Sequence, residues 1–172
     1  GDPRALTAAD YPLPRQIEQA FTRCGEIVLE GDFQANEQEQ SALVHQYGFL
    51  QSPEGLSDEL DASQTELVTR GFANAQVSMD QVQRMRPWLA ALTLVDVSHR
   101  LLGSEGRLQV IDYFFMRAQK RKIPVTSLER GSAQIKMFAA MPRALEVEWL
   151  VSTAMQQQAT IQEQEVTRSR IA

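Results

Sequence analysis

The chain has 172 residues, of which 43% are apolar and 23% are charged, so it is long enough for a domain with a proper core and is not disordered by composition. Its net charge of −5 argues against a nucleic-acid-binding protein, because such proteins concentrate Lys and Arg on one face. No apolar run approaches the roughly 20 residues that cross a bilayer, and no signal peptide is visible. We therefore expect residues 1–172 to form a single domain, or most of one.

The beginning of the chain predicts an extended segment, a helix and a strand. Three prolines within residues 1–14 favour an extended conformation. An amphipathic helix is predicted next, because apolar residues recur at helical spacing from Ile17 to Cys24. Residues 27–29 are apolar, and glycines bound the segment on either side. This run predicts a short strand that closes with Glu30 and is buried on both faces, as in a parallel sheet. Helix, glycine and buried strand in this order are typical of an α/β fold.

The middle of the chain is predicted to be mostly helical. Residues 33–55 carry weak patterns, and we expect a strand or hairpin followed by a loop. A helix is predicted over 61–74 with Asp61 or Ser63 as its N-cap, and a short helix over 79–84. Pro87 opens the strongest predicted helix, which runs to a glycine stop after Leu102. Its expected core-facing stripe is Trp88, Leu92, Val95, His99 and Leu102.

The last third predicts a helix over 108–120, a second buried strand over 123–128 and a helix over 130–140. A long final helix is expected from Arg143, with Val147, Leu150, Val151, Ala154 and Ile161 on one face. The apolar stripe thins toward the C-terminus, so this helix is a candidate surface for oligomer formation. The predicted class is α/β, dominated by helices, with a small and mostly parallel sheet.

Carboxylates at the predicted strand ends are the best candidates for chemistry. Glu30 ends the first strand, and ligands of open α/β sheets gather outside the carboxyl ends of strands. A carboxylate there can bind a divalent metal or act as a general base on a metal-bound water. Asp32 would point the same way as Glu30 if the strand continued through Gly31. The alternative is a solvated acidic turn without a ligand.

Two further residues are candidates for a supporting role. Glu129 ends the second predicted strand and would lie at the same sheet edge as Glu30; its alternative role is a helix N-terminal acid stabilised by the helix dipole. Arg86 precedes a Pro-Trp pair that predicts a helix start and a core aromatic side chain. If Arg86 faced the sheet edge, it would stabilise an anionic intermediate. The two histidines form no metal motif, and no serine-hydrolase, Walker or Rossmann signature occurs.

Three segments, 23–32, 84–94 and 111–134, appear in the same order as in the TraB/GumN family, which the chain resembles and to which the Tiki metalloproteases are related. In that family a short strand ends in a glutamate, a Lys/Arg-Pro-Trp opens an apolar helix, and a basic helix end leads into a strand that closes with Leu-Glu. The matching residues here are Glu30, Arg86-Pro87-Trp88, and Glu129 with Gln134. The resemblance implies that the chain is the middle part of a larger TraB/GumN-like domain.

The resemblance also implies a divalent-metal-dependent, peptidase-like hydrolase, with a metal such as manganese or cobalt and a peptide or protein substrate. The family's proposed active site uses two Gly-x-x-His motifs, and neither occurs in this sequence. We therefore expect Glu30 to bind the metal together with histidines outside this chain, and the chain alone to be inactive. An extracytoplasmic or membrane-associated parent protein is compatible with the resemblance.

Two departures from the family pattern keep another function open. Val110 stands where the family usually has glycine, and Arg130 stands where it has threonine. Together with the missing histidines, these differences favour the alternative of a non-catalytic module that binds a peptide or a partner protein on the same scaffold.

Overall fold

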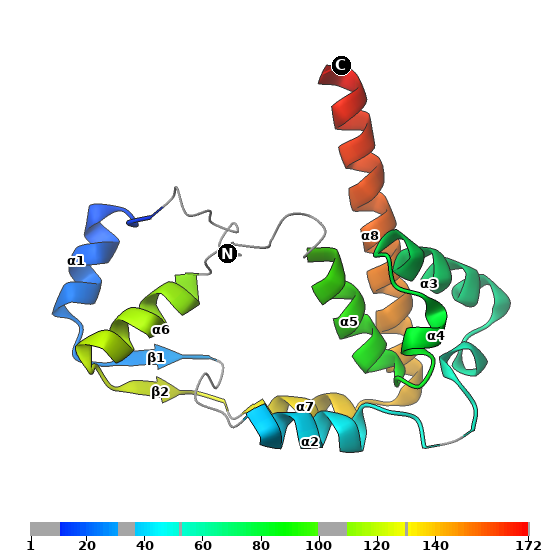
Figure 1. Cartoon of the computed structure of the whole chain (residues 1–172), viewed down its shortest axis with the longest axis horizontal. Coiled ribbons are helices and arrows are strands. Elements are labelled where there is room, and N and C mark those ends of the chain that lie inside the picture. Colours follow the sequence, from blue (N-terminus) through cyan, green and yellow to red (C-terminus); the bar gives the residue numbers. More distant parts are fainter. Residues whose placement is uncertain (1–10, 31–36, 52, 100–109, 130, 172) are drawn as a thin grey trace. The chain divides into compact units, whose positions relative to one another are not determined.

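The structure is a computed structural model, and it describes residues 11–30, 37–51, 53–99, 110–129 and 131–171 (Figure 1). Helices dominate it, so the predicted helix-rich α/β class is confirmed. No helix in the described ranges is both long and apolar enough to cross a membrane. The elements in chain order are α1 (Arg15–Arg23), β1 (Ile27–Leu29), α2 (Glu37–Tyr47), the 3-10 helix η2 (Leu56–Glu59), α3 (Ala62–Asn74), α4 (Met79–Val82), α5 (Pro87–His99), α6 (Val110–Arg121), β2 (Val125–Ser127), α7 (Gly131–Ala139) and α8 (Arg143–Ile171).

The chain divides into two compact units, each built from two separate stretches of sequence. The strand unit comprises Gly1–Gln40 and Gly103–Gln134, and it contains α1, both strands and α6. The helical unit comprises Ser41–Leu102 and Ile135–Ala172, and it contains α3, α4, α5 and α8. Helices α2 and α7 each cross the boundary between the two units. The assignment of the whole chain to one domain stays a prediction.

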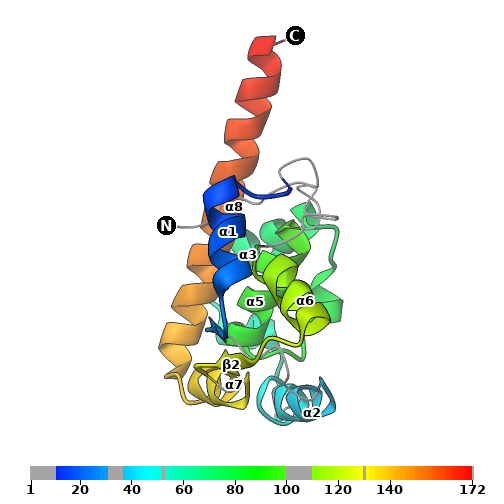
Figure 2. The ribbon, with the colours of Figure 1, turned by 90° about the vertical axis from the view of Figure 1, so that its left-hand side faces the viewer.

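In the strand unit, β1 and β2 form a two-stranded parallel sheet in which Ile27 pairs with Val125 and Leu29 with Ser127. The expected burial of this sheet on both faces is wrong. Helices α1 and α6 lie on one side of the strands (Figures 1 and 2), and within the described part of the strand unit no element covers the other side. As a result, the Val28 side chain is 53% exposed and that of Leu128, just after β2, is 72% exposed.

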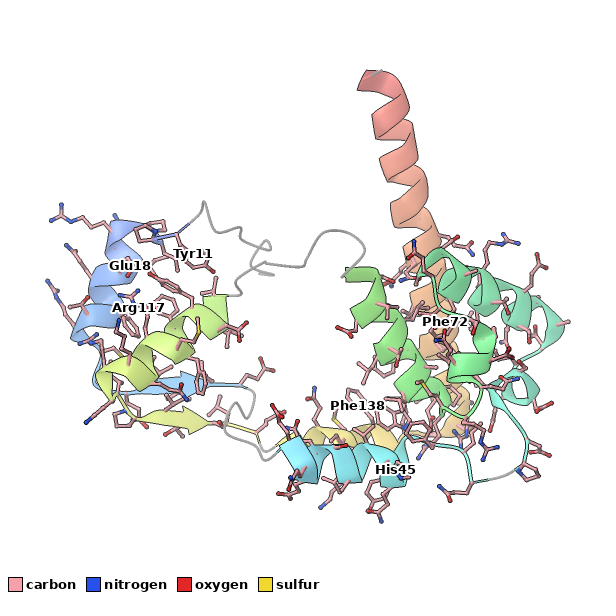
Figure 3. The ribbon with its side chains drawn as sticks, in the orientation of Figure 1. Tyr11, Glu18, His45, Phe72, Arg117 and Phe138 are labelled. Carbon is pink, nitrogen blue, oxygen red and sulfur yellow. The ribbon has the colours of Figure 1, made fainter. Side chains whose placement is uncertain are left out.

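Helices α1 and α6 are joined by a polar cluster. Arg117 Nη1 of α6 donates a hydrogen bond to Glu18 Oε2 of α1 at 2.5 Å, and the Tyr113 hydroxyl donates to Glu18 Oε1 at 2.8 Å. The Arg117 guanidinium also lies 4.5 Å from the ring centre of Phe21, close enough for a cation–π contact. Figure 3 shows Tyr11, Glu18 and Arg117 gathered between the two helices. The side chain of Glu18 therefore joins α1 to α6 through two hydrogen bonds.

Acidification is expected to loosen this contact. The hydrogen bond from Arg117 lowers the pKa of Glu18 below its ordinary value of 4.5, against the opposing effect of burial. A lowered folded-state pKa means that Glu18 stabilises the fold above its unfolded-state pKa, and that this stabilisation is lost as the pH falls through the folded-state pKa. The protection of amide hydrogens in α1 and α6, that is, their exchange rate relative to that of an unfolded chain at the same pH, should therefore fall at acid pH in the native chain. The Glu18→Gln variant should lack this pH dependence, whereas Glu66→Gln, an exposed control on α3, should keep it; equal pH responses of the native chain and Glu18→Gln would contradict the assignment.

In the helical unit, α3, α5 and α8 pack around one apolar core (Figure 1). Small residues let these helices approach closely. A Cβ atom added at Gly71 of α3 would lie 3.2 Å from Cβ of Ala154 on α8, which is tight for side-chain atoms. The fully buried members of the core are Leu56, Val68, Phe72, Ala90, Ala91, Leu94, Leu150 and Ala154.

Most predicted helix starts are confirmed. Asp61 caps α3, because its side chain accepts a hydrogen bond from the Gln64 N–H at 2.8 Å while the Gln64 side chain accepts from the Asp61 N–H at 3.0 Å. Ser78 precedes α4, and Pro87 is the first residue of α5. The predicted glycine stop of α5 and the start of the 108–120 helix fall partly within residues 100–109, outside the described ranges.

Two predictions for the helical elements differ from the structure, one entirely and one in part. Residues 33–55 do not form a strand or hairpin in their described part: α2 occupies Glu37–Tyr47. This helix buries no residue, so its sequence lacks the apolar period that would have predicted it, and good helix formers such as Glu, Gln, Ala and Leu favour it instead. The core-facing stripe on α5 is only partly as predicted. Trp88 is buried as expected, but Leu92 and Val95 are only partly buried. Ala90, Ala91 and Leu94 are fully buried instead, and the side chains of His99 and Leu102 lie outside the described residues.

Candidate functional site

The carboxyl ends of β1 and β2 meet at one edge of the sheet. The two strands run parallel and in register, and their pairing continues past the last strand residues. The Leu128 N–H donates to the Leu29 carbonyl at 2.8 Å, and the Glu129 N–H donates to the Glu30 carbonyl at 3.1 Å. Since neighbouring strands lie about 4.8 Å apart, the structure brings Glu30 and Glu129 side by side in the backbone, although 99 positions separate them in the sequence.

The side chains at this edge combine acidic and apolar groups. Glu30 and Glu129 are both exposed. The exposed side chain of Val28 lies two residues before Glu30, and that of Leu128 directly precedes Glu129. Glu26, two residues before Val28, accepts a hydrogen bond from the Thr126 hydroxyl at 2.6 Å. Such an edge can receive a cation through its carboxylates and an apolar side chain through Val28 and Leu128.

Glu129 also lies just before a helix. Helix α7 begins at Gly131 and is nine residues long, so the positive end of its dipole favours an acidic residue at this position. This interaction with the dipole of α7 gives Glu129 a structural role that does not depend on a ligand. The sequence predicted both roles, and the geometry is compatible with both.

The remaining predicted site residues lie elsewhere. Asp32 falls in residues 31–36, outside the described ranges. Arg86 belongs to the helical unit, where its guanidinium binds Glu146 of α8: Arg86 Nε donates to Glu146 Oε2 at 3.3 Å, and Arg86 Nη2 donates to Glu146 Oε1. The carboxylate of Glu146 is fully buried and also accepts from Arg143 Nη1 at 3.1 Å. The contribution of Arg86 to catalysis stays a prediction.

Sequence reasoning missed Glu146. The signal for it was present, because Glu146, Leu150 and Ala154 recur every fourth residue and therefore share one face of α8. All three side chains are fully buried. An acidic residue in line with an apolar stripe predicts a buried ion pair, since a buried carboxylate needs a partner.

The acidic residues that the sequence offered for metal binding, Glu30 and Glu129, lie at the sheet edge. No group of three or more His, Cys, Asp or Glu side chains that could hold a metal ion occurs within the described part of the chain. Two carboxylates suit a hard divalent cation such as Mn²⁺ in ligand type, although such ions take more ligands than two. The register of the strands places Glu30 opposite Leu128, one residue before Glu129, so the two glutamates are neighbours in the backbone, and a metal site at this edge stays a prediction.

Comparisons with known proteins agree with the resemblance noted in the sequence. The model of the TraB/PrgY/gumN family matches residues 5–169, which is nearly the whole chain. No curated protein and no solved structure matches the chain.

Proposed function

Since the chain belongs to the TraB/PrgY/gumN family, we propose that it contributes Glu30 and Glu129 to the active site of a divalent-metal-dependent, peptidase-like hydrolase. The observation that carries this proposal is the hydrogen bond of 3.1 Å from the Glu129 N–H to the Glu30 carbonyl. It holds two acidic residues at the carboxyl end of a parallel sheet, where ligands of α/β proteins bind.

The metal would be held in part by Glu30, with Glu129 as a second carboxylate nearby, and manganese or cobalt is the expected ion by family resemblance. A bound divalent ion supplies Lewis-acid chemistry, because it lowers the pKa of a coordinated water and polarises a carbonyl oxygen. The remaining ligands are expected to be the histidines of two Gly-x-x-His motifs in a longer protein. This chain has neither motif, and we expect it to be inactive alone.

The residues of this chain have separate proposed roles. Glu30 acts as a general base, which accepts a proton from the attacking water and returns it to the departing amine of the peptide. Glu129 orients a cationic or hydrogen-bonding group beside the reacting carbonyl. The exposed side chains of Val28 and Leu128 contact an apolar side chain of the peptide. These contacts would fix the peptide across the edge formed by β1 and β2.

A second candidate function is a non-catalytic module that binds a peptide or a partner protein. The observation that favours it is the exposure of two large apolar side chains, Val28 and Leu128, beside two exposed glutamates. This surface would hold an apolar residue flanked by Lys or Arg without any metal. In that case the glutamates would contribute to affinity and not to a reaction.

Replacement of Glu30 separates the two functions. In a longer protein that carries both Gly-x-x-His motifs, Glu30→Gln is expected to lower peptide hydrolysis with added Mn²⁺ or Co²⁺ by about 100-fold or more, the usual effect of losing a general base. The 172-residue chain should show no hydrolysis in the same assay. Glu66→Gln, which removes an exposed carboxylate of α3 in the helical unit, is the matched control and should leave hydrolysis unchanged. Full activity of Glu30→Gln would exclude the catalytic role, and peptide binding that persists without metal would favour the binding module.

A further inference from the structure

Arg121 joins the ends of the two helices that lead into the two strands of the strand unit (Figure 1). It is the last residue of α6, and it reaches the last turn of α1. Its Nη1 donates to the carbonyl of Phe21 at 3.2 Å, and its Nη2 donates to the carbonyl of Thr22 at 3.1 Å. The guanidinium also lies 5.3 Å from the ring centre of Phe21. One side chain of α6 therefore binds two carbonyl groups at the end of α1, where a helix runs out of backbone donors of its own.

The backbone between this contact and the start of the sheet is short and closely bonded. At the end of α6, Lys122 has a positive φ of 57°, and the Ile123 N–H donates to the Ala118 carbonyl at 2.9 Å. This is the Schellman arrangement, which fixes the direction in which a chain leaves a helix. The next residue, Pro124, accepts from the Ile27 N–H at 2.9 Å, and this hydrogen bond is the first between the two strands. All residues from the two helix ends to Glu30 and to Glu129 are described and lie in the strand unit.

The register of β1 against β2 needs such a contact. Arg121 and Phe21 are 100 positions apart in the sequence, so no short turn aligns the two strands that follow them. A slip by one position would turn the half-buried side chains of the sheet outward and is disfavoured. A slip by two positions keeps the same side chains on each face, but it moves one strand about 6.6 Å along the other. That movement would break the hydrogen bond from the Glu129 N–H to the Glu30 carbonyl.

We propose that Arg121 is a positioning residue for the acidic sheet edge, which sets the register of β1 against β2 and with it the pairing of Glu129 with Glu30. It does so by holding the ends of α1 and α6 together where both strands begin. The donors of arginine are fixed in one plane, so two bonds to successive backbone carbonyl groups define the position of α1 along α6. The inference rests on the proposed function for its catalytic meaning, but the register can be measured without it.

Disulfide formation between pairs of introduced cysteines reads the register directly. Val28 and Thr126 are partners in the native register, so their Cα atoms lie about 4.8 Å apart, which suits a disulfide. Val28→Cys with Leu128→Cys reports a slip by two positions in one direction, and Glu30→Cys with Thr126→Cys reports the opposite slip. In the native register the Cα atoms of each slipped pair lie about 8 Å apart, too far for a disulfide. In all variants of the whole chain, Cys24, its single cysteine, is replaced with serine.

The measurement is the initial rate of disulfide formation in the native pair divided by the rate in each slipped pair. Arg121→Met should lower this ratio for at least one slipped pair by about tenfold, the equivalent of one lost hydrogen bond to a charged group. Arg121→Lys, which keeps the cation but not the planar pair of donors, should lower the ratio less. Arg117→Met is the matched control, because it removes the contact of α6 with the Glu18 side chain and leaves the bonds to the end of α1. It should leave both ratios unchanged.

Two results would overturn the proposal. Both ratios could stay native in Arg121→Met, or they could fall as far in Arg117→Met as in Arg121→Met; in either case Arg121 stabilises the strand unit without setting its register. Amide hydrogen exchange in α6 shows whether the unit is folded in each variant. If Arg121→Met unfolds it, Arg121→Lys is decisive, and native ratios in that variant overturn the proposal. A failure of the hydrolase assay would not change these rates.

Discussion

Replacing Arg86 with methionine is expected to lower the free energy of unfolding of the helical unit by about 3–5 kcal/mol, the range measured when one partner of a buried ion pair is removed. The Glu146 side chain is fully buried, so it cannot exchange its lost partner for water. Arg143 Nη1 at 3.1 Å and the Trp88 nitrogen at 3.5 Å would be its remaining partners. The carbonyl groups of Tyr47 and Ala139 would each lose a donor as well.

The reverse substitution is expected to cost less. In Glu146→Leu, Arg86 keeps its hydrogen bonds to Tyr47 and Ala139, and its side chain is already 16% exposed, so water can solvate the guanidinium. The double variant, Arg86→Met with Glu146→Leu, should be more stable than Arg86→Met alone, because it also removes the buried carboxylate that has lost its main partner. If the variants show this order of stability, the loss in Arg86→Met comes from the desolvated Glu146 carboxylate and not simply from lost packing.

Tryptophan fluorescence during urea unfolding is the measurement for these variants. The chain has two tryptophans, and both, Trp88 and Trp149, lie in the helical unit, so their signal reports this unit. The control is Arg70→Met, which removes an ion pair with Glu66 on α3 whose two side chains are 56% and 72% exposed. Such surface pairs contribute at most about 1 kcal/mol. A loss in Arg86→Met no larger than that in Arg70→Met would show that the buried pair does not stabilise the unit.

Local sequence signals predicted much of the fold. The caps at Asp61 and Pro87 act within one helical turn, so their chemistry can be read from adjacent residues. The two strands could also be predicted from adjacent residues, because each is a short apolar run that follows the end of a helix. Once two parallel strands are assumed, the meeting of Glu30 and Glu129 at one edge follows from strand direction alone. The role of these two residues is a proposal that rests on family membership.

The parts that sequence reasoning missed depend on contacts between distant residues. Arg86 and Glu146 are 60 positions apart, and the residues around each of them do not indicate which residue is its partner. Helix α2 has no buried residue, so its apolar pattern is weak, and the bond from Arg86 to its last carbonyl comes from the helical unit. The uncovered sheet face was missed for a similar reason: the run of Ile27, Val28 and Leu29 predicts burial, but burial requires a second covering layer.

Removal of the Phe72 ring is the other large effect that we expect. Phe72 lies on α3 in the centre of the helical unit (Figure 3), and its side chain is fully buried in the core formed with α5 and α8. Phe72→Ala should lower the free energy of unfolding by about 3–5 kcal/mol, which is the lost transfer energy of the ring plus the energy of the cavity it leaves.

The size of this effect depends on whether the helices can close over the cavity, and the neighbouring residues indicate that they cannot. At Gly71, next to Phe72, α3 already lies so close to α8 that an added Cβ would be 3.2 Å from Ala154 Cβ and 3.5 Å from Leu94 Cδ2. A cavity that cannot collapse gives a loss near the upper end of the range. Met155→Ala is the control, because that side chain of α8 is 58% exposed and its truncation should change stability by about 0.5 kcal/mol or less. Urea unfolding followed by tryptophan fluorescence should place Phe72→Ala far below both the native chain and Met155→Ala; similar midpoints for the two variants would mean that α3 does not pack on α8 as described.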